Sequence, residues 1–260
     1  MQAEENNYNT GDSISALVYR LLRGPEVLVA SPETIRKMAA NGEPLRQVPD
    51  IPTEQAIDKL FEQRKAEAKE IADSLLPAPI PEAVYLYLYD QIRACALFGL
   101  FGPAITYCGL LVEYALKACT YIVESNGNPN FSGAEWDEFE TLTFGQMIPR
   151  AQKAGLIDEG MVKQFRGFKN DIRNTHSHFN IKKIAQDVVI RNVSIRNVET
   201  GETEVRDVPG IENPVFQVFA KEAADKNYFP QIFHISDTFT QHLICMTARL
   251  VPEQETANGV

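Results

Sequence analysis

Residues 158–179, with the sequence DEGMVKQFRGFKNDIRNTHSHF, carry the clearest periodic pattern in the chain. A set of side chains recurs there at alternating steps of four and three residues: Met161, Phe165, Phe168, Ile172, Thr175 and Phe179. On an α-helix this spacing places the whole set on one face. We therefore expect one continuous helix whose apolar seam packs against other helices.

Helical patterns extend on both sides of this seam. A helix over about residues 143–154 is expected to pair tightly with the seam helix across Gly155, after a loop around Trp136. Further helices are predicted over residues 14–22, 32–40, 53–76, 82–99, 103–125 and 230–250. The Tyr-x-Tyr-x-Tyr alternation at 85–89 also fits a strand, but the apolar run around it is too long for one strand, which favours a helix.

One stretch, residues 94–112, contains no charged residue and is about as long as a membrane-spanning helix. Gly102 and Pro103 lie in its middle, where a Gly-Pro pair interrupts a helix. We therefore interpret the stretch as two buried helices joined by a turn, and we expect no membrane partner.

Residues 187–208 differ from the rest of the chain because they are rich in β-branched residues. The segments VVIRNVSIRNV and EVRDV, joined by a turn at 199–201, predict a β-hairpin. The chain is thus predicted to be mainly α-helical, a bundle of four to five helices with an inserted hairpin. The expected parts are an N-terminal helical extension over residues 1–80, the bundle with its hairpin over 81–251, and a flexible tail over 252–260.

The composition is that of a globular protein. Of the 260 residues, 44% are hydrophobic and 23% are charged, which excludes disordered chains, collagen and coiled-coil rods. Lys and Arg number 25 against 35 Asp and Glu, so the net charge is -10 and general coating of nucleic acids is not expected. The acidic N-terminus lacks the segments of a secretory signal, and four scattered cysteines predict neither disulfides nor a zinc site. These features predict a cytoplasmic protein with reduced thiols.

The motifs of several common enzyme classes are absent. The chain has no GxxxxGK[ST], GxGxxG, HExxH or GxSxG pattern, which argues against P-loop ATPases, dinucleotide-dependent enzymes, zinc peptidases and α/β-hydrolases. His176 and His178 instead lie at the end of the seam helix, in a region, 158–183, where Lys and Arg outnumber Asp and Glu. Such a region suits phosphate chemistry, because Arg binds phosphate through several N–H donors and His exchanges protons near neutral pH.

Residues 173–178, Arg-Asn-Thr-His-Ser-His, match an RxxxxH pattern with a polar residue directly after the arginine. In this respect the chain resembles the HEPN domain family. The order of elements is also similar, with an amphipathic helix that carries Glu113, a short connecting helix, the motif helix and one more helix. The resemblance covers roughly residues 81–185 and 230–250, about half of the chain.

The resemblance implies a HEPN-like helical bundle that forms a homodimer, in which two copies of the motif face each other across a cleft. Many HEPN domains are metal-independent endoribonucleases of phage defence, toxin–antitoxin or RNA-processing systems. The resemblance further implies that His178 is the general acid or base for attack of an RNA 2′-hydroxyl on its own phosphodiester. Arg173 would stabilise the negative charge of the transition state, and Asn174 would orient it. No metal or other cofactor is implied, because the substrate supplies the nucleophile.

Helical geometry and the motif disagree on which histidine acts. At about 100° per residue, Arg173 and His178 lie about 140° apart around a regular helix. Four polar side chains instead gather on one flank of the seam: Arg166, Lys169, Arg173 and His176. Either the helix ends near Ser177 and swings His178 round, or a second protomer completes the site. We rank His178 first on the motif and keep His176 as an auxiliary residue, with Arg166 and Lys169 as candidates to bind RNA.

Other interpretations of the same residues stay open. A HEPN-like module that only binds a nucleotide, an RNA or a partner protein would share them. Arg and His near a helix C-terminus also stabilise the negative end of the helix dipole without any further role. Glu113 either pairs with Arg173 or faces solvent.

Overall fold

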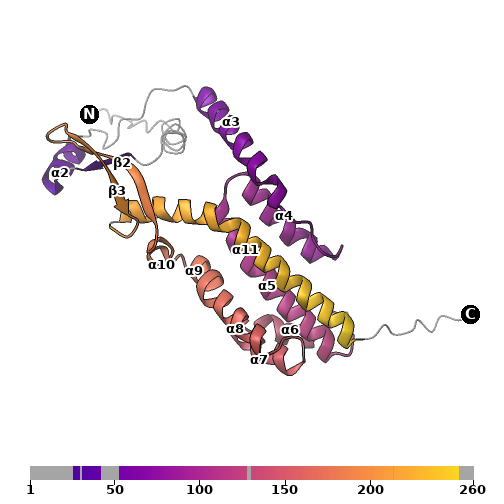
Figure 1. The fold of residues 1–260 in the computed structure, drawn as a ribbon. Coiled ribbons are helices and arrows are strands. Elements are labelled where there is room, and N and C mark those ends of the chain that lie inside the picture. The colour runs from indigo at the N-terminus through magenta and orange to yellow at the C-terminus, as the bar shows by residue number, and fades with distance from the viewer. Residues whose placement is uncertain (1–25, 30, 42–52, 128–129, 213, 252–260) are drawn as a thin grey trace, which may run out of the picture. The chain divides into compact units, whose positions relative to one another are not determined.

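The computed structural model describes residues 26–29, 31–41, 53–127, 130–212 and 214–251 (Figure 1). These residues are mainly α-helical and include a β-hairpin, so the predicted fold class is confirmed. The predicted helix over 14–22 and the predicted tail over 252–260 lie outside the described residues.

The chain divides into two compact units, and the first contains residues 1–70 and 185–221. Its sheet has three strands in the order β1-β2-β3. The predicted hairpin is formed by β2 (Val189–Asn197) and β3 (Thr203–Pro209), which pair antiparallel. A strand that the sequence did not indicate, β1 (Glu26–Val29), pairs in parallel with β2. The hairpin therefore belongs with the N-terminal part of the chain.

Two helices of the first unit follow the prediction. These are α2 (Pro32–Ala40) and α3 (Thr53–Ile71), the latter continued by a 3-10 turn. The start of α2 is bound to the hairpin turn, because the Ser31 amide and the Thr34 hydroxyl donate to the Glu199 carboxylate at 3.1 and 2.6 Å. These hydrogen bonds lower the pKa of Glu199.

The second unit comprises residues 71–184 and 222–260, and its described residues are mainly helical. Its elements are α4 (Ala83–Leu97), α5 (Phe101–Glu124), α6 (Ala134–Thr141), α7 (Phe144–Lys153), α8 (Glu159–Phe168), α9 (Asn174–Ser177), α10 (Ile181–Ala185) and the larger part of α11 (Pro214–Leu250). The predicted helices appear in the predicted order, whereas the sequence did not indicate α6 or α10 as helices. The uncharged stretch forms two helices, as expected. Gly99 between them adopts a φ of 71°, and Pro103 lies in the first turn of α5, where proline is tolerated. Within the described segments, we find no helix with the length and apolar character needed to cross a bilayer.

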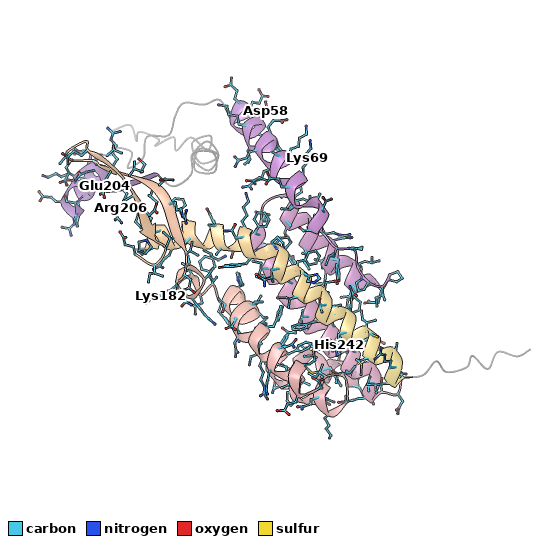
Figure 2. All side chains as sticks on the ribbon, in the orientation of Figure 1. Asp58, Lys69, Lys182, Glu204, Arg206 and His242 are labelled. Carbon is cyan, nitrogen blue, oxygen red and sulfur yellow. The ribbon has the colours of Figure 1, made fainter. Side chains whose placement is uncertain are left out.

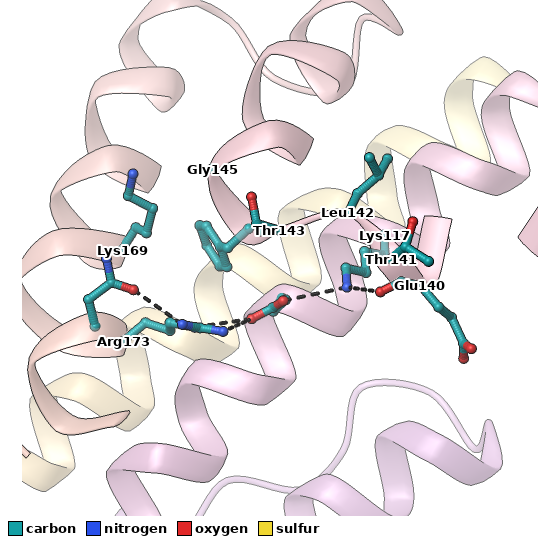
Figure 3. Close-up of a pocket in the computed structure, with 11 residues that line it drawn as sticks. Lys117, Glu140, Thr141, Leu142, Thr143, Gly145, Lys169 and Arg173 are labelled. Atoms are coloured by element: carbon teal, nitrogen blue, oxygen red, sulfur yellow. Dashed lines mark hydrogen bonds and ion pairs between the residues drawn. The ribbon is translucent and has the colours of Figure 1, made fainter. Parts of the chain in front are cut away.

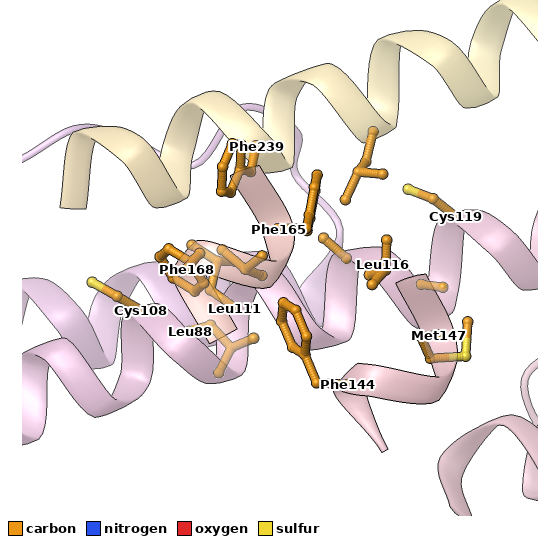
Figure 4. Close-up of a cluster of buried hydrophobic side chains, with 14 of the residues drawn as sticks. Leu88, Cys108, Leu111, Leu116, Cys119, Phe144, Met147, Phe165, Phe168 and Phe239 are labelled. Carbon is orange, nitrogen blue, oxygen red and sulfur yellow. The ribbon is translucent and has the colours of Figure 1, made fainter. Parts of the chain in front are cut away.

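The core of the second unit is aromatic and centres on the predicted seam (Figure 4). Phe165 is fully buried and stacks on Phe239 of α11, with ring centroids 4.4 Å apart. The ring centroid of Phe144, on α7, lies 6.3 Å from the ring centroids of both Phe165 and Phe168. The seam thus joins α7, α8 and α11 to the buried helix α5.

The expectation of one continuous helix over 158–179 is wrong at its end. After α8 the backbone forms a π-helical turn over Lys169–Arg173, followed by the short α9. The seam is kept as far as Thr175, which is 5% exposed, but Phe179 is 64% exposed and has a φ of 49°. Phe179 leaves the seam because the helix ends at Ser177.

Two further boundaries differ from the prediction. The last helix begins at Pro214, and Pro230, which was expected to start it, lies inside it. Burial of Phe229 and Phe233 on either side of this proline holds the helix together, although proline removes one backbone hydrogen bond. The segment around Trp136 is the helix α6 and not a loop, and Trp136 is 6% exposed. Trp136 therefore packs into the core of the second unit.

The other two histidines and the cysteines differ in how far they are buried. His242, on α11 (Figure 2), contacts the carbonyl oxygen of Leu156 through Nε2 at 3.1 Å. His234, on the same helix, is exposed. Cys108 is buried, and burial raises the pKa of its thiol. Cys119 is also buried, whereas Cys95 is partly exposed and Cys245 is exposed.

Candidate functional site

A pocket of about 460 Å³ lies in the second unit beside the predicted motif. Three cationic side chains line it: Lys117, Lys169 and Arg173. Two carboxylate residues, Glu113 and Glu140, and the polar side chains of Asn174, Thr141 and Thr143 complete most of the lining. The pocket therefore lies between α5, the ends of α6 and α7, and the π-helical turn. Four residues singled out from the sequence line it: Glu113, Lys169, Arg173 and Asn174.

Arg173 heads a chain of ionic contacts that runs across the pocket (Figure 3). Its Nε and Nη2 atoms donate to the same carboxylate oxygen of Glu113, at 3.1 and 3.0 Å. The other oxygen of Glu113 lies 3.5 Å from Lys117 Nζ, which donates to the carbonyl oxygen of Glu140 at 3.0 Å. Glu113 is thus the partner of Arg173 and does not face solvent, which resolves the alternative that the sequence left open.

Asn174 contacts the guanidinium, and Lys169 lines the pocket beside Gly145. Asn174 Oδ1 accepts a hydrogen bond from Arg173 Nη1 at 3.2 Å. A Cβ atom placed on Gly145 would lie 3.3 Å from Lys169 Nζ, so the glycine leaves room for the ammonium at the start of α7. Lys169 Nζ makes no hydrogen bond or ion pair with any residue that the structure describes. One cation of the pocket is consequently available to a ligand.

The walls of the pocket are held by local structure. Thr143 caps α7 and forms a capping box with Gln146, which fixes the backbone where α7 begins. Trp136 Nε1 donates to Glu140 Oε1 at 3.0 Å and packs among the rings of Phe131, Tyr121 and Tyr114. The apolar residues of α6 therefore position the segment that Lys117 contacts.

His176 lies away from the pocket. Its Nδ1 atom is 3.6 Å from Asp225 Oδ1 of α11, and the two side chains are 8% and 5% exposed. This placement corrects the expectation from helical geometry that His176 shares a flank with Arg173. A buried imidazole beside a buried carboxylate ties α9 to α11 within the same unit.

His178 is exposed at the C-terminal cap of α9. The helix ends at Ser177, as expected if the end of the helix were to swing His178 toward Arg173. His178 is nevertheless not among the described residues that line the pocket. Arg166 is also exposed and outside the pocket, on α8. Within one chain, the structure brings together Arg173, Asn174 and Lys169 and leaves His178, His176 and Arg166 apart from them.

The π-helical turn explains why the expected flank does not form. A π turn bonds residue i to residue i+5 and shifts every residue after it relative to an α-helix. The Thr175 hydroxyl donates to the carbonyl oxygen of Asn170 at 2.9 Å within this widened turn. Angles calculated at 100° per residue therefore fail between Arg166 and His176. Such turns occur often at functional sites.

Sequence reasoning missed Lys117, Glu140 and Thr143 as lining residues. One signal was present, because Glu113 and Lys117 are four residues apart and are the charged residues of positions 101–123. Among the residues described, no cluster of three or more His, Cys, Asp or Glu side chains has the arrangement of a metal site.

Comparison of the chain with models of protein families, with curated proteins and with solved structures gives no match. The chemistry of the pocket and the residue pattern at 173–178 are therefore the basis for a functional assignment.

Proposed function

We propose that this chain is an endoribonuclease that binds an RNA phosphate at the Arg173 pocket and cleaves the adjacent bond without a metal ion. The observation that carries the proposal is the meeting of Arg173, Asn174 and Lys169 in one pocket. Guanidinium and ammonium groups in a partly enclosed site stabilise a phosphate whose negative charge increases in the transition state. The resemblance of residues 173–178 to the HEPN motif supplies the choice of RNA.

In the proposed reaction the ribose 2′-oxygen forms a bond to phosphorus and the bond from phosphorus to the 5′-oxygen breaks. His178 accepts the proton of the 2′-hydroxyl while water protonates the leaving 5′-oxygen, or His178 protonates the 5′-oxygen while water accepts the 2′-hydroxyl proton. Arg173 and Lys169 balance the charge on the phosphate oxygens, and Asn174 orients the guanidinium through its contact with Nη1. The products are a 2′,3′-cyclic phosphate and a 5′-hydroxyl.

A second copy of the chain is part of this proposal. His178 is exposed and separate from the pocket of its own chain, so a homodimer in which each copy offers His178 to its partner's pocket would complete two sites. A cytoplasmic role in phage defence or in a toxin–antitoxin system belongs to the same proposal. It predicts that expression of the active protein arrests bacterial growth.

One observation favours a second function, a module that binds RNA, a nucleotide or a partner protein without cleaving it. Glu113 neutralises part of the charge of Arg173, and the two side chains are 13% and 26% exposed. An arginine held in an internal ion pair also serves to stabilise a helix packing. The two functions differ in one measurable property, which is whether RNA in contact with the purified protein stays intact.

The two histidines of the motif provide the first test. We expect His178→Ala to lower the rate of RNA cleavage in EDTA by about 100-fold or more, the usual contribution of a general acid or base, without a change in thermal stability. His176→Ala should lower the melting temperature, because His176 is buried against Asp225, while the folded variant keeps most of its activity. Equal activity of wild type and His178→Ala would contradict the proposed role of His178.

A small substitution on α5 tests whether the position of Arg173 matters. A methyl group at Gly109 would lie 3.1 Å from Arg173 Cγ, which is closer than an ordinary carbon contact of about 3.5–4.0 Å. We expect Gly109→Ala to stay folded and to lower the cleavage rate about tenfold, because it displaces the guanidinium. Gly167→Ala is the matched control, since a methyl group there meets nothing within 4 Å. Loss of activity in both variants would mean that replacing a helical glycine by alanine lowers activity wherever it lies, and not through the position of Arg173.

A further inference from the structure

Glu113 is the most enclosed charged group that contacts Arg173. Its side chain is 13% exposed and projects from α5, where Gly109 on the preceding turn allows Arg173 to approach closely. One carboxylate oxygen accepts both the Nε and Nη2 hydrogen bonds of Arg173, and the other faces Lys117. Both oxygens are therefore engaged by cations of the pocket.

These contacts determine how Arg173 is presented to a ligand. A guanidinium has five N–H donors. Two of them are bonded to Glu113 and one to Asn174, so two stay available, one on Nη1 and one on Nη2. The Nε and Nη2 pair, which would otherwise bind a phosphate in a forked manner, is occupied by the carboxylate. A phosphate is left with the outer end of the guanidinium.

We propose that Glu113 is a positioning residue, which fixes the orientation of Arg173 and in doing so weakens the binding of the RNA phosphate. The inference rests on the proposed function and adds a specific property to it. A carboxylate next to the bound phosphate repels the ligand in the ground state. The same carboxylate holds the two free donors of Arg173 at the place where charge increases during the reaction. Glu113 therefore lowers the affinity for RNA and raises the rate of cleavage.

The substitution Glu113→Gln separates these two effects, because it removes the charge and keeps an oxygen that accepts hydrogen bonds. Binding is measured with an RNA whose ribose groups are 2′-O-methylated, so that no cleavage occurs. We expect the Kd of this RNA to fall about tenfold, the effect of removing one charge about 6 Å from a phosphate in a partly solvated site. Turnover of unmodified RNA should fall by about 10- to 100-fold, because Arg173 is no longer fixed. A residue with only a structural role would not change Kd and turnover in opposite senses.

Glu113→Asp is the second variant, and it retains the charge but shortens the side chain by one methylene group. We expect its turnover to fall as in Glu113→Gln, with the Kd close to that of the wild type. The matched control is Glu124→Gln, also on α5, where the carboxylate binds Arg150 through Nε and Nη2 at 3.0 and 2.7 Å outside the pocket. The control should change neither Kd nor turnover.

The outcomes distinguish this inference from the proposed function. If the wild type cleaves RNA and Glu113→Gln leaves both Kd and turnover unchanged, the inference is overturned and the ribonuclease proposal stands. If the wild type binds RNA without cleaving it, the ribonuclease proposal fails, and the Kd of Glu113→Gln alone tests the role of Glu113. A lower Kd supports a position of Glu113 beside the bound phosphate. An unchanged Kd overturns the inference. Absence of any RNA binding by the wild type overturns both.

Discussion

Replacement of Arg173 by alanine is expected to reduce the rate of RNA cleavage by about 100- to 1000-fold, the usual loss when one donor to a developing negative charge is removed from an active site. Arg173 carries the only guanidinium group among the described residues that line the pocket. Lys169 cannot replace it, because an ammonium group lacks the planar arrangement of several N–H donors. Arg173→Lys should recover little of the activity, because an ammonium cannot bond Glu113 and a phosphate with a fixed geometry. The measurement is initial cleavage of a fluorescent RNA in EDTA.

Stability has to be measured on the same samples. Arg173→Ala removes two hydrogen bonds to Glu113. A hydrogen bond to a charged group contributes about 1.5–3 kcal/mol to the free energy of unfolding. Circular dichroism must therefore show that the variant is folded at the assay temperature. Lys163→Ala, an exposed residue of α8 that pairs only loosely with Glu159 at 3.8 Å, is the control for loss of positive charge. A folded Arg173→Ala variant with wild-type activity would show that the pocket has no part in the reaction.

Phe165→Ala is expected to have the largest effect on folding, with a loss of about 3–5 kcal/mol in the free energy of unfolding. Phe165 is fully buried, stacks on Phe239 and contacts Phe144, so its removal leaves a cavity between three helices. The free energy is measured by denaturant unfolding followed by circular dichroism.

Phe179 provides the matched control for this substitution. It belongs to the same periodic pattern in the sequence, but it is 64% exposed after the end of α9. Phe179→Ala should change stability by no more than about 0.5 kcal/mol. A large loss in Phe179→Ala would mean that the seam continues past Ser177 as a regular helix. A small loss in Phe165→Ala would contradict the placement of Phe165 in the core.

The long periodic segments of the sequence predict the helices well. The alternation of four- and three-residue steps identifies the face of α8 that carries Phe165 and Phe168, because burial of one face is what selects this spacing. The hairpin is equally predictable from its β-branched residues and its glycine turn. The strand β1 is not, because only pairing with the distant β2 makes so short a segment a strand.

The site is less predictable than the helices around it. Residues 173–178 identify Arg173 and Asn174, but the π-helical turn decides which other residues share their surroundings. No local pattern indicates that turn, and it moves His176 to the core and leaves His178 on the surface. The partner of Arg173 comes from a helix 60 residues earlier in the chain, and its identity depends on the packing of α5 against the motif helix.

The most direct test of the proposed function is cleavage of one RNA oligonucleotide by the wild-type protein in EDTA, with the product ends identified by mass spectrometry. We predict fragments that end in a 2′,3′-cyclic phosphate, and no cleavage when the nucleotide at the cut site carries a 2′-deoxyribose. Intact RNA at every protein concentration, or equal cleavage of the deoxyribose-substituted oligonucleotide, would contradict attack by the 2′-hydroxyl at the Arg173 pocket.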